Sequence, residues 1–217
     1  RLYIVSDSDW PHFYVTDLTL ANLQQVRIGT LGNYSRDLED LDVGPCGTKS
    51  CLYWANIGGN NQRRDSVEIV FIEELETFPE RVEPMHRFYL EYPDGDNDAE
   101  GMAVHPNGDI YILSKEGVSV TGIRSAKLYR TRALAWPEPD APLPLEHIAT
   151  VDLRSLSGSL VDLFSHTATA LDISPDGQRF MILTYGNAFE INLDLDTLTS
   201  GTVLKIDKTT PHTNIPV

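Results

Sequence analysis

Short segments in which apolar and polar residues alternate recur along this chain, in pairs joined by turn residues. The clearest pair spans residues 98–115 (DAEGMAVHPNGDIYILSK), where Pro106-Asn107-Gly108-Asp109 separates two apolar stretches. Alternation with a period of two predicts β-strands, and glycine-containing turns between such strands are typical of hairpins. This segment therefore predicts a β-hairpin.

The same hairpin pattern occurs at two other places and survives in part at a third. Residues 36–56 and 167–185 repeat it, and the tripeptides before the turns align without gaps as Val43-Gly44-Pro45, Val104-His105-Pro106 and Ile173-Ser174-Pro175. Residues 2–6 (LYIVS) match residues 110–114 (IYILS), the second strand of the clearest hairpin. The chain is therefore a repeat protein.

Two more short strands are expected after each hairpin, which gives four strands per repeat. Their positions are 13–18 and 25–28, 67–72 and 86–92, 127–130 and 147–153, and 189–193 and 203–207. A repeated four-stranded meander is typical of the antiparallel blades of a β-propeller, whereas a β-sandwich with hairpins that are alike by coincidence is the alternative. We expect one all-β propeller domain, with repeat units at about 1–33, 34–95, 96–164 and 165–217.

Only three of these units are complete, so the propeller is expected to be incomplete in this chain. An unclosed propeller would leave sheet edges exposed, which folded proteins avoid. We therefore expect another chain, or sequence missing here, to complete the ring. No run of 18 apolar residues is present, so no membrane span is expected.

The charge balance limits the classes of partner. Seventeen basic residues against 32 acidic ones give a net charge of −15, which argues against nucleic acids and anionic membranes as partners. The acidic excess has two interpretations: a solvated exterior, or clustered carboxylates that hold divalent cations.

Cys46 and Cys51 flank the turn of the first complete hairpin and face each other across it. Two thiols alone make a poor zinc site, and a redox-active pair normally has two intervening residues at a helix start. A structural disulfide is therefore predicted, and with it an oxidising compartment, so that the protein is secreted or periplasmic.

The repeat alignment places acidic residues at one level of the innermost strands. Glu39, Glu100 and Thr169 occupy this level, and two glutamates from neighbouring blades pointing into one channel are costly unless a cation neutralises them. Ca²⁺ accepts six to eight oxygen ligands with loose geometry. The predicted ligands, among them candidates that complete the shell, are Glu39, Asp40, Asn56, Asn60, Asp98 and Glu100.

Two observations qualify this calcium prediction. The segment that begins at Asp94 starts like an EF-hand loop, but Gly is missing at the sixth place and His105 stands at the twelfth, so an EF-hand is excluded. The alternative to a metal site is an acidic surface loop in which Glu100 pairs with an arginine.

A second set of candidate residues lies where the second strand of each repeat ends. Mixed polar groups at matching positions suggest a channel or pocket lining there. The corresponding residues are Asp7, Ile57, Lys115 and Tyr185, preceded by Ser6, Asn56, Ser114 and Thr184. In the loop 56–65, Arg63 and Arg64 would clamp a carboxylate or phosphate, or pair with Glu39, Asp40 or Asp65 inside the fold. His166 directly precedes an inner strand and is a candidate general base, with Lys115 assisting and Tyr185 contacting a small-molecule substrate.

The segment DAEGMAVHPNGDIYILSKEG resembles the blade motif of calcium-dependent β-propeller phytases, and more loosely the gluconolactonase and paraoxonase-like propellers. The resemblance implies that Glu100, and Glu39 in the parallel repeat, are metal ligands. It covers about 20 residues of each repeat. Thr169 replaces the glutamate in the third hairpin, and the dense basic set expected around a polyphosphate substrate is absent. The resemblance therefore supports the fold and the metal more than the activity.

Two functions follow from these expectations. The first is a secreted or periplasmic, Ca²⁺-stabilised propeller that acts as a binding or assembly module. The alternative is a metal-dependent hydrolase of phosphate esters or lactones, with Glu39 or Glu100 as ligand and His166 or Lys115 assisting. A coordination shell closed by protein would favour the first function, and one open towards a pocket the second.

Overall fold

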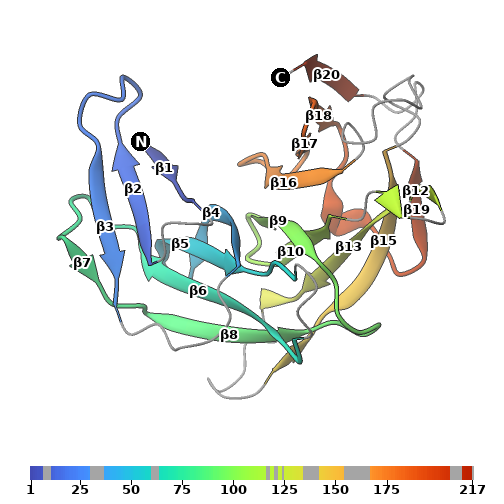
Figure 1. Ribbon diagram of the computed structural model, residues 1–217, viewed down its shortest axis with the longest axis horizontal. Helices are drawn as coiled ribbons and strands as arrows, with labels where there is room; N and C mark the ends of the chain where they lie inside the picture. The colour runs from blue at the N-terminus through green and yellow to red at the C-terminus, as the bar shows by residue number, and fades with distance from the viewer. Residues whose placement is uncertain are drawn as a thin grey trace.

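The computed structural model describes residues 1–6, 11–29, 37–59, 64–115, 118–119, 122–123, 125–133, 142–153, 167–205 and 212–216. Within these residues, four small β-sheets stand around a common centre as the four blades of a β-propeller (Figure 1). The predicted all-β propeller is therefore confirmed. No helix in these ranges is long and apolar enough to cross a membrane.

Each blade is a sheet of four or five strands. The first contains, in spatial order, β1 (Leu2–Ile4), β2 (His12–Thr16), β3 (Gln24–Ile28) and β7 (Arg81–Val82). The second contains β4 (Leu38–Cys46), β5 (Lys49–Asn56), β6 (Val67–Glu73), β8 (His86–Glu91) and β14 (Leu143–Pro144). The third contains β9 (Ala99–Val104), β10 (Ile110–Ser114), β13 (Ala126–Thr131), β15 (Glu146–Asp152) and β19 (Thr202–Lys205). The fourth contains β16 (Ala168–Ile173), β17 (Phe180–Thr184), β18 (Asn187–Ile191) and β20 (His212–Pro216).

Two smaller elements lie outside the four blades. The strands β11 (Val118–Ser119) and β12 (Gly122–Ile123) form a two-stranded hairpin. A 3₁₀ turn, η3 (Leu195–Thr197), follows β18 and begins at Asp194, whose side chain accepts a hydrogen bond from the Asp196 amide.

The innermost strands of three blades are those that the repeat alignment predicts. The strands β4, β9 and β16 are the first strands of the three complete hairpins, and they pack against one another at the centre. In the first blade, β1 pairs with β2 as β10 pairs with β13, so β1 is the equivalent of a second strand. Among the described residues, no strand pairs with the other edge of β1. The first and fourth blades face each other across the open side of the molecule (Figure 1).

Neighbouring blades are joined by a strand that the sequence does not reveal. In three repeats the chain between the third and fourth strands crosses to the preceding blade and pairs in parallel with its fourth strand. The pairs are β7 with β3, β14 with β8, and β19 with β15. We call these three segments, β7, β14 and β19, clasp strands. The prediction that residues 203–207 supply the fourth strand of the last blade is therefore wrong, because β19 belongs to the third blade and β20 takes the fourth position.

The core consists of three apolar clusters, one between each pair of consecutive blades. Strand alternation divides β5 between two of them: Leu52 and Trp54 pack towards the first blade, whereas Tyr53 and Ala55 pack towards the third. Trp54 is fully buried, as expected for a residue that packs between blades. Trp10 and Trp136 lie outside the described residues.

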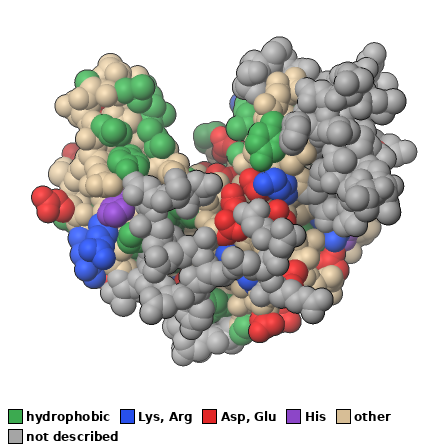
Figure 2. Space-filling view, viewed as in Figure 1, with side chains coloured by type: hydrophobic (Ala, Val, Ile, Leu, Met, Phe, Trp, Pro, Cys, Tyr) green, Lys and Arg blue, Asp and Glu red, His purple; other side chains and the backbone are tan. Residues whose placement is uncertain are grey.

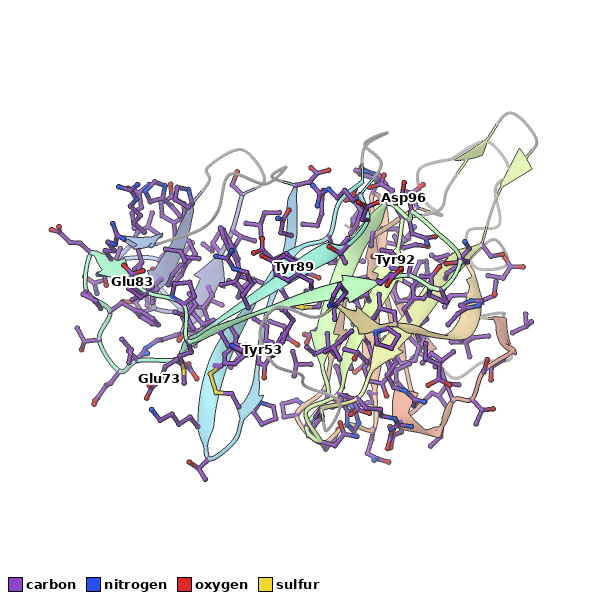
Figure 3. The ribbon with its side chains drawn as sticks, turned by 90° about the horizontal axis from the view of Figure 1, so that it is seen from below. Tyr53, Glu73, Glu83, Tyr89, Tyr92 and Asp96 are labelled. Carbon is purple, nitrogen blue, oxygen red and sulfur yellow. A yellow bond between two sulfur atoms is a disulfide. The ribbon has the colours of Figure 1, made fainter. Side chains whose placement is uncertain are left out.

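The predicted disulfide is present. Cys46 and Cys51 are bonded across the β4–β5 turn, with their Cα atoms 5.9 Å apart. Gly47 at this turn adopts a φ of +67°, which glycine reaches without steric cost. The Tyr53 hydroxyl donates to the Pro45 carbonyl at 2.6 Å, so the hairpin is also closed by a hydrogen bond close to the disulfide (Figure 3).

Candidate functional site

Each of the three innermost strands carries a β-bulge near its beginning. The register shifts lie between Leu38 and Asp40, between Ala99 and Gly101, and between Ala168 and Ala170. The extra residues are therefore Glu39, Glu100 and Thr169, the three that the sequence places at one level. A bulge redirects the side chain of the extra residue and is common beside functional sites. The same β-bulge thus redirects one side chain in each of the three innermost strands.

The side chains of Glu39 and Glu100 meet at this level. Glu100 lies close enough to Glu39 for each to affect the pKa of the other, and it accepts a hydrogen bond from Lys115, with which it forms an ion pair. Asp37 also lies close to Glu39 and contributes to the shift of its pKa. We call Asp37, Glu39, Asp98, Glu100 and Lys115 the mouth cluster. In the view of Figure 2, acidic side chains gather near the centre of the molecule beside a basic one.

The charges in the mouth cluster are not balanced, because four carboxylates stand against one ammonium group. Burial, together with the charges of Glu100 and Asp37, raises the pKa of Glu39 to about 9. Burial also raises the pKa of Glu100, although Lys115 opposes this shift. Burial lowers the pKa of Lys115, but its hydrogen bond to Glu100 and the charges of Glu100, Tyr185 and Asp98 outweigh burial and raise it. At neutral pH the two glutamates therefore share a proton unless a further cation is supplied.

The glycines of the β5–β6 loop let the backbone approach the mouth cluster. The Gly58 amide donates to the Asp37 carbonyl at 3.1 Å, and the Gly59 amide donates to Asp98 Oδ1 at 2.8 Å. A Cβ atom at Gly58 would lie 2.2 Å from Glu39 Oε1, and one at Gly59 would lie 3.1 Å from the Asn97 carbonyl oxygen. Gly58 thus packs closely against the Glu39 and Asp37 side chains, and Gly59 packs closely against the backbone of Asn97 and Asp98.

Asp40 was predicted as a metal ligand, and in the structure backbone amides surround its carboxylate. Its carboxylate accepts amide hydrogen bonds from Leu41 at 2.9 Å, from Met102 of β9 at 2.9 Å and from Leu171 of β16 at 3.3 Å. One side chain therefore joins the innermost strands of three blades. Burial outweighs these hydrogen bonds and raises the pKa of Asp40 to about 7.

Asp42 repeats this arrangement two residues further along β4. Its carboxylate accepts from the Val104 amide at 2.7 Å and from its neighbour Val43 at 2.6 Å. Burial raises the pKa of Asp42 to about 7, and the charge of Asp172 adds to the shift. These two aspartates make the centre of the propeller a polar junction between strands.

The polar residues at the ends of the second strands do not line a channel. Asn56, Ser114 and Thr184 are buried, and each bonds to its own blade. Asn56 Oδ1 accepts from the Asp37 amide at 2.9 Å, Ser114 Oγ accepts from the Lys127 amide at 2.9 Å, and Thr184 Oγ1 donates to the Asn187 carbonyl at 3.1 Å. The expectation of a channel lining is therefore wrong for these three residues, which hold strand ends together.

The structure brings some predicted site residues together and leaves others undescribed. Lys115 joins the mouth cluster, and Tyr185, 55% exposed, is close enough for its charge to affect that lysine. The arginine alternative for Glu100 is wrong, because its partner is Lys115. Asn60, Arg63 and His166 lie outside the described residues. Across the part of the chain that the structure describes, no group of three or more His, Cys, Asp or Glu residues is arranged to hold a metal ion.

Arg64 lies at a pocket that the sequence did not reveal. Its Nη1 donates to the carbonyl oxygen and to Oδ1 of Asn56, at 3.3 and 3.2 Å, and its backbone amide donates to Asp96 Oδ1 at 3.2 Å. The pocket has a volume of about 360 Å³ and is lined by Arg64, Asp65, Glu91, Tyr92, Gly95 and Asp96. In the sequence, the predicted clamp residue Arg64 and the acidic run 94–100 pointed to this region, but not to a pocket.

Comparisons with known proteins give distant structural likenesses. No protein-family model and no curated protein sequence matches the chain. A complex of KlAtg21 with the coiled coil of AgAtg16 is 11% identical with a TM-score of 0.41, and the match covers 87% of this chain and 49% of that one. The major Malassezia sympodialis allergen Mala s 1 is 11% identical with a TM-score of 0.47, covering 95% and 72%. YCF48 bound to D1 peptide is 12% identical with a TM-score of 0.29, covering 88% and 64%. The chain thus spans about half the length of the first of these proteins, and none of the three assigns a function to it.

Proposed function

We propose that this chain is a secreted or periplasmic binding and assembly module, whose first blade packs against a further β-blade and whose mouth cluster binds Ca²⁺. One observation carries the assembly proposal. Leu2 and Ile4 on β1 are 38% and 43% exposed, whereas the matching residues Ile110 and Ile112 on β10 are fully buried. In the third blade, the second blade covers Ile110 and Ile112. No described blade covers the matching residues of the first blade. The disulfide supports the oxidising compartment.

The loop between β2 and β3 extends this uncovered surface. It occupies the position from which later repeats send a clasp strand to the preceding blade, and it carries Leu18, Leu20 and Leu23, which are 77%, 62% and 59% exposed. Hydrophobic side chains are visible over this part of the first blade in Figure 2. We call Leu2, Ile4, Leu18, Leu20 and Leu23 the first-blade surface. Contiguous exposed apolar patches mark interaction sites.

The loop is held in one shape before any partner arrives. Asp17 accepts hydrogen bonds from the Thr19 amide at 2.8 Å, the Thr19 hydroxyl at 2.5 Å and Asn22 Nδ2 at 2.9 Å. These hydrogen bonds lower the pKa of Asp17 to about 2. Leu20 adopts a φ of +59°, which is rare for a leucine and costs free energy. An ordered loop reduces the entropy that binding must overcome.

The partner is expected to be a β-blade with a free outermost strand, supplied by another chain or by further sequence. The regular pattern of clasp strands supports this choice, since every such segment in the described residues pairs with the outermost strand of a neighbouring blade. A second copy of the chain presents such an edge on β20, which has no clasp strand among the described residues. The most direct test is therefore self-association.

Sedimentation velocity over a wide concentration range would measure self-association, and binding of an apolar fluorescent dye would measure exposure of the surface. We expect wild-type protein to associate or to bind the dye, and Ile4→Asp combined with Leu20→Asp to reduce both signals. Val203→Asp is the matched control, because Val203 is 59% exposed but lies on β19, away from the first blade. A wild-type monomer with no dye response, unchanged by the double substitution, would refute the assembly proposal.

The calcium proposal rests on the donor set of the mouth cluster. Asp37, Glu39, Asp98 and Glu100 offer hard oxygen atoms, which Ca²⁺ prefers, and Lys115 alone leaves an excess of negative charge. Burial, together with the charges of Glu100 and Asp37, raises the pKa of Glu39 to about 9, and a divalent cation bound there would favour the ionised form of this glutamate. Glu39 and Glu100 are the proposed principal ligands. Asp40 and Asn60 stay predictions as ligands.

A melting scan with Ca²⁺ and with chelator tests the cation. We expect Ca²⁺ to raise the melting temperature of wild-type protein and to have no effect on Glu39→Gln combined with Glu100→Gln. Glu80→Gln is the control, because Glu80 is exposed on a loop between β6 and β7. Equal melting temperatures with Ca²⁺ and chelator would count against the calcium site but would leave the assembly proposal intact.

The second candidate function is a cation-dependent hydrolase of phosphate esters or lactones. It is favoured by the strong perturbation of Glu39 and Lys115, since shifted pKa values gather at functional sites. A bound divalent cation would polarise such a substrate and lower the pKa of bound water. Lys115 and the exposed Tyr185 would hold an anionic group at the mouth, whereas His166 lies outside the described residues. Phosphatase and lactonase assays with and without Ca²⁺, repeated on Lys115→Met, decide between the two functions.

A further inference from the structure

The pocket beside Arg64 is separate from the mouth cluster and from the first-blade surface. Three loop segments form it: the end of the β5–β6 loop (Arg64 and Asp65), the end of β8 with the residue after it (Glu91 and Tyr92), and the β8–β9 loop (Gly95 and Asp96). Tyr92 and Asp96 lie beyond the same end of β8 (Figure 3). Its volume of about 360 Å³ falls at the lower end of the range for small-molecule sites.

The hydroxyl of Tyr92 is the feature that points to a ligand. The side chain is 8% exposed, and its hydroxyl oxygen is buried without a hydrogen-bond partner among the described residues. Buried polar groups are almost always paired, and leaving one unpaired costs about 1–3 kcal/mol. The ring is fixed by an edge-on contact with Tyr129, with ring centroids 4.8 Å apart. Tyr92 therefore lines the pocket with its hydroxyl unpaired, at the expense of stability.

The walls of the pocket are held by contacts of their own. Asp94, just outside the pocket, accepts from Lys127 Nζ at 2.8 Å and from the Tyr129 hydroxyl at 3.0 Å. Asn97 Nδ2 donates to the Gly95 carbonyl at 2.9 Å, and Gly95 adopts a φ of +88°. Apart from its two neighbours in the chain, no described residue has an atom within 4 Å of the place where a Cβ would stand on Gly95. The loop is thus anchored on both sides of Gly95, while the space in front of that residue stays open.

The charges in the pocket select the kind of ligand. Three carboxylates, on Asp65, Glu91 and Asp96, stand against the single guanidinium of Arg64. Asp65, Glu91 and Asp96 are exposed, so each keeps acceptor sites towards the opening. The whole chain carries a net charge of −15, which attracts cations over a longer range. An anionic ligand would meet repulsion from both sources.

We propose that this pocket binds a primary ammonium group carried on a short alkyl chain. An ammonium group has three donors, which match two carboxylates and the lone pairs of the Tyr92 hydroxyl. A compact alkylammonium also suits a pocket of this volume. The group is offered by a free diamine and by a lysine side chain of a peptide. Both sources carry the alkylammonium group, but in lysine the alkyl chain is attached to a peptide backbone, whereas in a diamine it ends in a second amine.

Isothermal titration calorimetry with 1,5-diaminopentane and with Nα-acetyl-lysine methylamide tests the proposal. The titrations are run in chelator, so that a divalent cation cannot compete, and pentanoate serves as the anionic counterpart. We expect at least one of the two amines to bind and pentanoate not to bind. Preference for the lysine compound would identify a peptide ligand, and preference for the diamine would identify a free amine. Absence of binding for both amines at millimolar concentration would overturn the proposal.

Two substitutions assign the binding to this pocket. Tyr92→Phe removes only the hydroxyl, and Asp96→Asn removes one charge; each is expected to weaken amine binding about tenfold or more. Tyr89→Phe is the matched control, because the Tyr89 hydroxyl accepts a hydrogen bond from Arg87 at 3.4 Å and Tyr89 does not line the pocket. Since the Tyr92 hydroxyl is unpaired, Tyr92→Phe should unfold at the same urea concentration as wild type or a higher one. Unchanged amine affinity in a folded Tyr92→Phe variant would overturn the proposal.

Discussion

The junction at Asp40 makes the stability of the propeller depend on pH in a way that one substitution should remove. Burial raises the pKa of Asp40 to about 7, from 3.8 in the unfolded chain. Between these values the folded state holds a proton that the unfolded state has lost, so the stabilisation is complete below pH 3.8 and is lost as the pH rises through 7. At about 1.4 kcal/mol per pH unit, Asp40 accounts for a loss of about 4 kcal/mol across this window.

Asp40→Asn keeps an oxygen that accepts from the Met102 and Leu171 amides but cannot ionise. Its amide nitrogen would face the Leu41 N–H, and this unpaired contact should cost about 1–3 kcal/mol at every pH. We therefore expect the variant to be less stable than wild type at pH 4 and to lose less stability as the pH rises. The difference between the two free energies of unfolding should change by about 3 kcal/mol from pH 4 to pH 7.

Urea unfolding between pH 4 and 8 measures this difference, with the fluorescence of the fully buried Trp54 as the reporter. Glu80→Gln is the control for removing an exposed carboxylate. Asp42 and Glu39 also titrate in or near this range, but both remain in the variant and cancel in the comparison. Parallel pH profiles for wild type and Asp40→Asn would show that the carboxyl is not held in the folded state as described.

Three further predictions concern the scaffold and are checked by the same urea unfolding. Replacing Cys46 and Cys51 by Ser should lower the free energy of unfolding by about 2 kcal/mol, because the disulfide closes a short ring. Adding reductant to wild-type protein should lower the free energy of unfolding by the same amount. An unchanged free energy of unfolding would contradict the loop-entropy reasoning. Gly101→Ala should lower the free energy of unfolding by about 1–3 kcal/mol, because the new Cβ would lie 2.8 Å from the Leu171 backbone nitrogen. Gly58→Ala should lower it less, because the atoms in front of Gly58 belong to side chains that can move. Val82→Asp on the clasp strand β7 should lower stability by at least about 2 kcal/mol, while Arg81→Gln beside it, in an exposed ion pair with Glu83, should change little; equal effects would mean that β7 is not packed as described.

The sequence predicted the features that depend on local pattern and on repetition. Alternating apolar residues and glycine turns located the hairpins, and their gap-free alignment brought Glu39, Glu100 and Thr169 to one level, where the structure has three bulges. The disulfide followed from the position of the cysteines across one turn. These signals are short-range, so a single sequence contains them.

The features that the sequence missed depend on contacts between blades. Strands as short as Arg81–Val82 and Leu143–Pro144 show no alternation, and their parallel pairing joins residues that are far apart in the chain. The sequence grouped Asp40 with Glu39 and could not show that its carboxylate accepts hydrogen bonds from Met102 and Leu171 of two other blades. The unpaired hydroxyl of Tyr92 could not be foreseen, because its burial depends on packing against residues that are distant in the chain, Tyr129 among them.

The clasp strands have a consequence for the modularity of this chain. Because the third blade is completed by β19, which lies beyond the first three strands of the fourth repeat, deleting the last repeat would also strip a strand from the blade before it. A sequence repeat and a blade in Figure 1 therefore do not contain the same residues, because a blade that ends in a clasp strand takes that strand from the next repeat. Duplicating, removing or transplanting a whole blade would require its clasp strand to be included.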